Sequence, residues 1–417
     1  MNRTVLFVAL RQLWARKALN SIAVLGVTLG VLTLIGINGI MQGFQVKFLT
    51  NIVKVSPHVT IKDKQLRPSA SILARFTGDF VVTQVSHETP SDRQLRINRP
   101  YEIVNGLLRM EGVAGAAASL AGSAVLAVGA KQYPVDLRGI DPARQDKVTP
   151  ISQFVEKGSY RALSASADGM IVGSGVAKEL GVKVGDVVRC GAVGPTMNLK
   201  VVGIFDAALP PVDNRRVYVT IRTAQILLGK PDVIGQIEIR LNDPERASEV
   251  RAKLERGLGY DAESWQEANA NFLALFKQQN MIIGFVVGAI LAVGGFGILA
   301  IQIMIVLQKT RDIAILRSVG FHRRDILAAF LLQGAIISSI GAALGSVGGH
   351  YLVAFLGTLK VKQEGLVKSE SFLVYEDPVF YFYGVFFALF VGLLASFIPA
   401  LRASRVEPVD VLRGQIG

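Results

Sequence analysis

Few residues in this 417-residue chain stand at spacings that support catalysis or metal binding. The four histidines, His58, His87, His322 and His350, are too scattered to form a metal-binding pair on one helix. The single cysteine, Cys190, excludes an intrachain disulfide or a multi-cysteine metal site, and its apolar strand pattern predicts a core residue. Because no pairing of nucleophile and base can be named either, we predict no catalytic residue, no metal site and no enzymatic activity.

Two short segments resemble phosphate-binding loops only in composition. A P-loop needs two glycines five residues apart followed by Lys and Ser or Thr, whereas Gly229-Lys230 lacks the first glycine and precedes Pro231. The segment Gly173-Ser174-Gly175 opens no dinucleotide-binding unit and is interpreted as a tight turn. We therefore predict that the chain has no ATP-hydrolysing site of its own and binds no cofactor.

Charged residues are absent from four long apolar stretches. The chain is 51% hydrophobic and only 18% charged, and residues 18–46, 278–308, 326–359 and 378–401 contain no Asp, Glu, Lys or Arg. Each stretch exceeds the roughly 20 residues that cross the hydrocarbon core of a bilayer as a helix. They predict four transmembrane helices, and the first is too long for a cleaved signal peptide.

The positions of basic residues predict how these helices are oriented. Basic residues outnumber acidic ones in residues 1–17, 309–325 and 402–417, whereas residues 360–377 carry a small acidic excess. By the positive-inside rule, both termini and the 309–325 loop are cytoplasmic, and the 360–377 loop lies outside. The long segment 47–277 is then extracytoplasmic, which is periplasmic for a protein of a bacterial inner membrane.

This topology also explains most of the formal net charge of +13, which comes from 45 Lys and Arg against 32 Asp and Glu. The excess lies mainly in the segments predicted to be cytoplasmic, so it does not indicate a nucleic-acid partner. The uncharged spans argue against a transporter that carries protons on buried acids. Residues 1–17 fit an amphipathic helix lying on the inner leaflet, which makes membrane lipid a partner.

The segment 47–277 reads as a large α+β domain inserted between the first two spans. Gly129–Ala130 predicts a hairpin turn, and Pro244–Leu258 a helix. Residues 62–100 and 158–169 are candidate hinges, so two subdomains are expected. The predicted strands are Val59–Lys62, Phe80–Val85, Val125–Val128, Val135–Ile140, Val187–Cys190, Leu199–Phe205, Val217–Ile221 and Gln236–Leu241.

Two features of the spans bear on how they pack and move. A helical pattern runs without a breaker from about 267 to 308, which favours a stalk between the outer domain and the membrane over a tilted span. Glycines four residues apart allow helices to approach closely, either within this chain or at a subunit interface. These glycines are Gly26 and Gly30, Gly39 and Gly43, and Gly341 and Gly345.

Three segments resemble the MacB/FtsX/lipoprotein-releasing class of ABC transporter permeases. The stretch 308–326 is similar to the cytoplasmic coupling segment of that class, and 399–413 to its C-terminal signature. The stretch 171–186 resembles a recurring part of its outer domain. Within the class, residues 38–44 together with 56–61 look more like the lipoprotein-releasing branch. The order of one span, a large outer domain and three spans fits the same class.

The resemblance implies that residues 309–325 contact a separate cytoplasmic ATPase. An amphipathic helix there would place Ile313, Leu316 and Val319 against the membrane domain, leaving Arg311, Asp312, Arg317 and Arg324 for the partner. A solvated positive-inside loop is the alternative. The expected coupling residues are Arg311, Asp312, Ile313, Leu316, Arg317, Gly320, Arg324 and Asp325.

The class implies a permease that pairs with a second copy or a paralogue and with a dimer of ATPase subunits that bind magnesium ATP. Motion driven by ATP would then expel an amphiphilic cargo, with lipoprotein release favoured. Two alternatives remain open at this stage. One is signalling of the FtsX kind to an extracytoplasmic hydrolase, and the other is efflux of the MacB kind through an outer adaptor.

Overall fold

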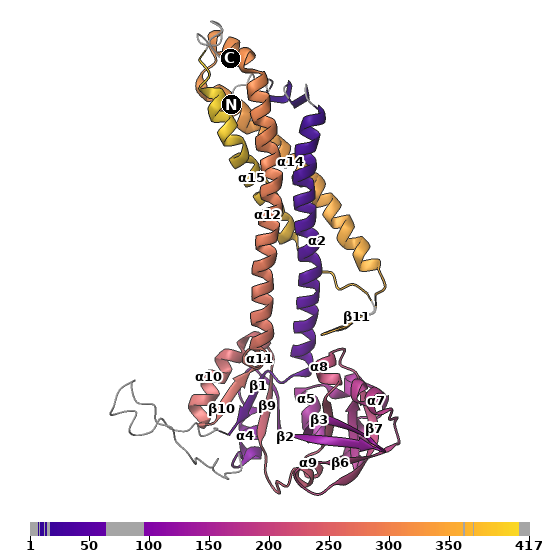
Figure 1. The fold of residues 1–417 in the computed structure, drawn as a ribbon. Coiled ribbons are helices and arrows are strands. Elements are labelled where there is room, and N and C mark those ends of the chain that lie inside the picture. The colour runs from indigo at the N-terminus through magenta and orange to yellow at the C-terminus, as the bar shows by residue number, and fades with distance from the viewer. Residues whose placement is uncertain are drawn as a thin grey trace, which may run out of the picture. The chain divides into compact units, whose positions relative to one another are not determined.

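The computed structural model describes residues 7–407, except residues 8, 12, 15–16, 64–95, 362 and 370. The chain divides into two compact units (Figure 1). Residues 1–46, 274–363 and 369–417 form a helical unit, and residues 47–273 with 364–368 form an outer domain. The predicted strand Phe80–Val85 and most of the 62–100 hinge lie outside the described residues.

Four helices in the described part of the chain are long and apolar enough to cross a membrane. They are α2 (Lys17–Val55), α12 (Ala270–Gln308), α14 (Arg323–Thr358) and α15 (Pro378–Ser404). They extend past the uncharged stretches because polar caps set their ends. The Asp377 side chain accepts from the Val379 N–H at the start of α15, and Asp325 accepts from the His322 N–H before α14.

The helix expected from about residue 267 to 308 is broken once. The short helix α11 (Trp265–Ala268) begins with a capping box between Ser264 and Glu267. Asn269 then leaves the helical conformation before α12 begins. The Trp265 carbonyl accepts from the backbone N–H of Asn269 and also, at 2.8 Å, from its side chain. Hydrophobic periodicity continues through this point, so it did not reveal the break.

Small residues bring the helices of the membrane unit together. Figure 1 shows α2 and α12 running alongside each other, and a Cβ added at Gly26 would contact Gly294 at 3.5 Å. On the other side of α2, Gly341 and Gly345 of α14 lie against Val27 and Val31. Gly30 lies at Leu291, Gly39 at Val353, and Gly43 against the backbone of Leu373. These contacts are all internal to the chain.

Helices α14 and α15 interlock through reciprocal glycine–serine pairs. Ser396 of α15 lies over Gly334 of α14, while Ser338 of α14 lies over Gly392 of α15. Gln302 of α12 joins this contact, because its Nε2 donates to the Ser396 Oγ at 2.9 Å. The small residues let α14 and α15 approach closely, and the hydrogen bond between Gln302 and Ser396 joins α12 to this contact.

The outer domain contains one sheet of ten strands and eight short α-helices among its described residues. The strands are β1 (Val59–Lys62), β2 (Val113–Val128), β3 (Lys131–Ile140), β4 (Val155–Gly158), β5 (Gly169–Gly173), β6 (Val187–Gly191), β7 (Met197–Phe205), β8 (Arg216–Thr220), β9 (Gln236–Leu241) and β10 (Asp261–Ser264). The helices are α4 (Pro100–Leu107), α5 (Pro142–Val148), α6 (Arg161–Ala165), α7 (Ser174–Leu180), α8 (Pro210–Asp213), α9 (Ile221–Leu227), α10 (Ala247–Leu258) and α11.

The sheet order is β10-β1-β9-β2-β3-β8-β5-β7-β4, and β6 pairs with both β2 and β7. Strands β2, β3, β8, β5, β7 and β6 therefore form a closed ring, and β1, β9 and β10 continue from the other end of β2. The turn between β2 and β3 holds Gly129 at φ 59°, a left-handed conformation that suits glycine. The hairpin predicted at Gly129–Ala130 is therefore present.

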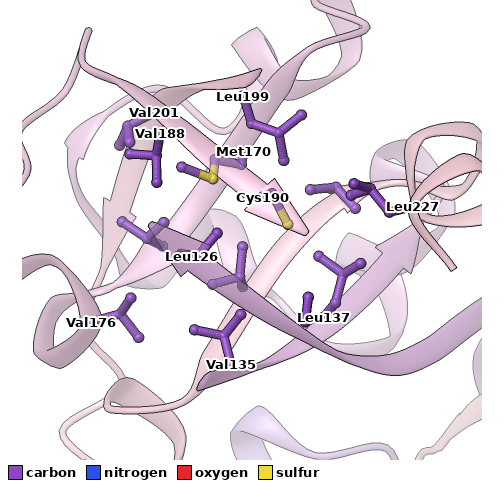
Figure 2. Packing of buried hydrophobic residues seen from close by; sticks show 14 of the residues in the cluster. Leu126, Val135, Leu137, Met170, Val176, Val188, Cys190, Leu199, Val201 and Leu227 are labelled. Atoms are coloured by element: carbon purple, nitrogen blue, oxygen red, sulfur yellow. The ribbon is translucent and has the colours of Figure 1, made fainter. Parts of the chain in front are cut away.

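The ring encloses an aliphatic core. Figure 2 shows Cys190 of β6 among side chains of the facing strands, including Leu126, Leu137 and Met170. Burial raises the pKa of the Cys190 thiol to about 11, so it stays protonated and acts as a small apolar residue. The predicted boundary at 158–169 lies between β4 and β5, two strands that both pair with β7 in the same sheet. The 16-residue strand β2 pairs with β3 and β6 in the ring and with β9 outside it. All ten strands therefore belong to one sheet.

We predict that Gly334→Ala destabilises the membrane unit by about 1–3 kcal/mol, the usual cost of overpacking. A Cβ there would clash with the Ser396 side chain and lie 2.9 Å from the Gly392 carbonyl oxygen. Gly288→Ala is the matched control, because nothing lies within 4 Å of its added Cβ. Thermal unfolding of the full chain in detergent measures both, and equal melting temperatures would contradict the interlocked packing.

Candidate functional site

The segment between α12 and α14 forms a short helix, α13 (Thr310–Ser318). An ion pair of 2.6 Å between the Lys309 ammonium and the Asp312 carboxylate lies at its start. At its end, Gly320 has φ 107°, which reverses the chain toward α14. The predicted coupling segment thus contains a defined helix that ends shortly before a glycine in the left-handed conformation.

One face of α13 is built into the membrane unit. Ile313 and Ala314 are fully buried, and Ile313 belongs to a cluster with Ala400 and Ala403 of α15. Leu316 and Phe321 pack against the same cluster while staying partly exposed. Displacing α13 therefore requires moving the packed ends of the long helices as well.

Two residues of α13 have notable surroundings. Arg317 is half-buried, and its guanidinium donates to the carbonyl oxygen of Val406. Val319, expected to pack against the membrane unit, is 77% exposed. At about 100° per residue, Val319 stands on the side of the helix opposite Arg317, which shares a face with Ile313.

The outward face of α13 combines charged and aliphatic side chains. Arg311 and Asp312 are exposed, and they stand beside Ile315, which is 46% exposed, and Val319. Arg324 at the start of α14 is exposed as well, while Asp325 is half-buried and caps that helix. Exposed aliphatic residues rimmed by charges are typical of a protein–protein contact. We call Arg311, Asp312, Ile315, Val319 and Arg324 the α13 face.

A second charged group lies in the outer domain. The Lys368 ammonium is 2.7 Å from the Asp206 carboxylate, 3.0 Å from that of Asp213 and 2.8 Å from the Ser174 hydroxyl. Residues 364–368, which include Lys368, belong to the outer-domain unit although they are part of the loop between α14 and α15. The Lys368 N–H also donates to the Ala208 carbonyl at 3.0 Å. This cluster holds the tip of that loop to the outer domain.

The two carboxylates of the cluster have different environments. Burial raises the pKa of Asp213 to about 6, even though the Ala207 and Leu209 N–H groups and Lys368 donate to it. Burial of Asp206 acts in the same direction, but hydrogen bonds from Lys368, Ala208 and Ser174 outweigh it and lower its pKa. Sequence reasoning missed the cluster because Lys368 is far along the chain from its partners.

The histidines do not gather into a site among the described residues, and no group of three His, Cys, Asp or Glu there could hold a metal ion. His58 is buried, and its Nδ1 accepts from the Leu241 N–H at 3.1 Å. Its burial lowers its pKa, which keeps the ring neutral. His58 thus supports the sheet at β9, and His87 lies outside the described residues.

Four apolar helices, an α+β domain inserted after the first of them and a short amphipathic helix between the second and third define a membrane permease subunit. The family model for the MacB-like periplasmic core domain matches residues 21–256, and that for the FtsX-like permease C-terminal region matches residues 284–408. The chain belongs to this family and is an ABC transporter permease of the MacB/FtsX/lipoprotein-releasing class.

Curated relatives cover nearly the whole chain. It is 27% identical to the lipoprotein-releasing system transmembrane protein LolC of Xylella fastidiosa, over 94% of this chain and 92% of the relative. It is 23% identical to the macrolide export ATP-binding/permease protein MacB of Agrobacterium fabrum, over 96% of this chain and 59% of the relative. The periplasmic region of MacB from Actinobacillus actinomycetemcomitans matches 54% of this chain at 14% identity, with a TM-score of 0.34.

We predict that Asp213 makes stability depend on pH. Folding raises its pKa from the ordinary 3.8 to about 6, so the folded state binds this proton more tightly than the unfolded chain. The resulting stabilisation is complete below pH 4 and is lost as the pH rises through 6, a change of about 3 kcal/mol. The free energy of unfolding of the wild type relative to Asp213→Asn should fall by that amount between pH 4 and 7.

The control for this measurement is Asp232→Asn, which changes an exposed aspartate of the same domain. The pH dependence seen for Asp213→Asn should exceed any that this variant shows over the same range. A constant difference for Asp213→Asn would contradict the buried, proton-binding role assigned to Asp213.

Proposed function

We propose that this chain is the permease subunit of an ABC transporter that releases lipoproteins from the membrane, driven by a separate ATPase. The observation that carries the proposal is similarity over the full length to LolC proteins, which spans 92% of the Xylella fastidiosa protein and 98% of that of Neisseria meningitidis. Similarity to MacB also covers this chain, but only 59% of the MacB protein of Agrobacterium fabrum. Lipoprotein release is therefore the favoured activity, and efflux is the alternative.

In the proposed topology, both termini and α13 lie in the cytoplasm, and the outer domain lies in the periplasm of a bacterial inner membrane. The basic excess in residues 1–17 and 309–325 supports this orientation. It places the α13 face where a cytoplasmic ATPase dimer can reach it. Magnesium ATP would be bound by that partner, and a second permease copy or a paralogue would complete the complex.

The α13 face supplies the contact with the ATPase in this proposal. Ile315 and Val319 are the apolar anchors, and Arg311 and Arg324 give charge complementarity at the rim. The opposite face of α13 transmits the motion, because Ile313 and Ala314 are buried and Arg317 is bonded to the segment after α15. A displacement of α13 by the ATPase would therefore also move the ends of α14 and α15, because these segments are packed together.

Two kinds of connection link the membrane unit with the outer domain in the proposed mechanism. The helices α2 and α12 each run for 39 residues and pass the boundary between the two units without a break. The loop between α14 and α15 is held to the outer domain through Lys368. The four spans contain no acidic or basic residue in their predicted cores, so an amphiphilic cargo that never crosses the bilayer suits this architecture.

We predict that Ile315→Asp combined with Val319→Asp lowers copurification of the ATPase at least tenfold, because two carboxylates would replace the apolar anchors. ATP-dependent release of a labelled lipoprotein from proteoliposomes should fall in parallel. The measurements are MgATP hydrolysis by the purified complex and lipoprotein recovered in the soluble fraction.

The matched control places the same two charges on exposed aliphatic residues of the outer domain, Val193→Asp with Ile226→Asp. This variant should keep its associated ATPase. Normal ATPase association and release in the Ile315 and Val319 variant would overturn the assigned contact. Transport of a macrolide in place of a lipoprotein by the wild-type complex would favour the efflux alternative.

A further inference from the structure

A groove of about 400 Å³ lies in the membrane unit between the N-terminal helical residues, the beginning of α2 and the middle of α14. Its walls are mostly aliphatic, and they include Leu10, Val24, Ile336 and Ile340. Its polar lining residues, Trp14, Lys17, Asn20 and Ser21, come from the start of α2 and the residues just before it. The groove thus combines mostly apolar walls with a polar part, the two kinds of surface that a phospholipid presents.

Asn20 provides the decisive atom in the polar part. Its side chain is only 7% exposed, and its Nδ2 donates to the Leu13 carbonyl oxygen at 2.9 Å. That bond fixes the amide orientation, because a carbonyl can only accept. The Oδ1 atom is left buried without a hydrogen-bond partner. An unpaired buried acceptor is costly, so the site calls for a ligand that donates an N–H or O–H.

A cation stands beside this acceptor. The Lys17 ammonium lies 4.4 Å from the centre of the Trp14 ring, and Trp14 is 69% exposed. Tryptophan and lysine at the end of a membrane helix are typical of the interface where lipid headgroups lie. The groove therefore offers one positive charge and one acceptor in its polar part, next to mostly apolar walls.

We propose that the groove binds a phospholipid whose headgroup carries a primary ammonium, of the phosphatidylethanolamine class. Lys17 would pair with the phosphate, an ammonium N–H would donate to Asn20 Oδ1, and an acyl chain would lie along Ile336 and Ile340. The proposal requires only that α2 and α14 lie in a membrane. It is independent of ATPase coupling, and the topology proposed above makes the lipid one of the inner leaflet.

The chemistry predicts a particular selectivity. Phosphatidylcholine has the same phosphate and the same acyl chains, but its quaternary ammonium has no N–H to donate to Asn20. Monomethyl and dimethyl phosphatidylethanolamine each keep at least one N–H. Affinity should therefore fall at the last methylation and change little at the first two, a pattern that headgroup size alone does not produce.

Native mass spectrometry of the full chain in detergent tests this series with lipids of identical acyl chains. We expect phosphatidylethanolamine and its first two methylated forms to bind about tenfold more tightly than phosphatidylcholine, the effect of one hydrogen bond to a charged group. Equal binding of all four lipids, or a drop at the first methylation, would overturn the proposal. Tighter binding of phosphatidylglycerol would overturn the ammonium assignment.

Variants then locate the site. Asn20→Leu should abolish the preference for phosphatidylethanolamine over phosphatidylcholine, whereas Lys17→Gln should weaken both lipids alike. Asn38→Leu is the matched control, because Asn38 also lies on α2 and donates to the carbonyl of Leu34 at 2.8 Å. A preference that persists in Asn20→Leu would overturn the site, and the methylation series on the wild type stays decisive if that variant folds poorly.

Discussion

The architecture depends on one constraint, that a bilayer interior leaves no backbone N–H or C=O group without a partner. Continuous helices meet this demand, and it confines charged side chains to the helix ends. The caps at Asp325 and Asp377 and the ion pair of Lys309 with Asp312 all lie at such ends. Inside the unit, the remaining polar groups must find each other, as Gln302 and Ser396 do. The glycine–serine pairs of α14 and α15 then set how closely the helices pack.

Two faces of one short helix connect this packing with the proposed activity. Ile313 and Ala314 tie α13 to the ends of α14 and α15, and the outward side of α13 carries Ile315 and Val319. In the proposed mechanism, the exposed side of α13 contacts the ATPase, and the buried side passes the motion to the long helices. The outer domain resists deformation for a similar reason, because the ring of six strands surrounds a continuous aliphatic core. Lys368 fastens a second segment to that domain through Asp206 and Asp213.

Features that depend on neighbouring residues in the sequence were predicted well. The four spans, strand Val59–Lys62 and the Gly129 turn each follow from composition or from a local conformational preference. Features that depend on distant segments were not predicted. The contact of Arg317 with the Val406 carbonyl is one of them, because the acceptor comes from the segment after α15. The break at Asn269 was missed because the spacing of apolar residues, on which the prediction rested, does not show that Ser264 caps a separate helix, α11.

The sequence by itself determined the number of spans, the inserted domain and the permease class, and it supplied the proposal of a coupling segment. All of these rest on hydrophobic length, on charge distribution along the chain and on the motifs of residues 308–326 and 399–413. Only the tertiary structure decided which face of α13 is exposed in this chain, which residues lie against each glycine of the spans, and that Lys368 meets Asp206 and Asp213. It also revealed the unpaired Asn20 Oδ1 in its groove. The physical reason is that burial and pairing are properties of segments brought together in space, and no local pattern records which segments meet.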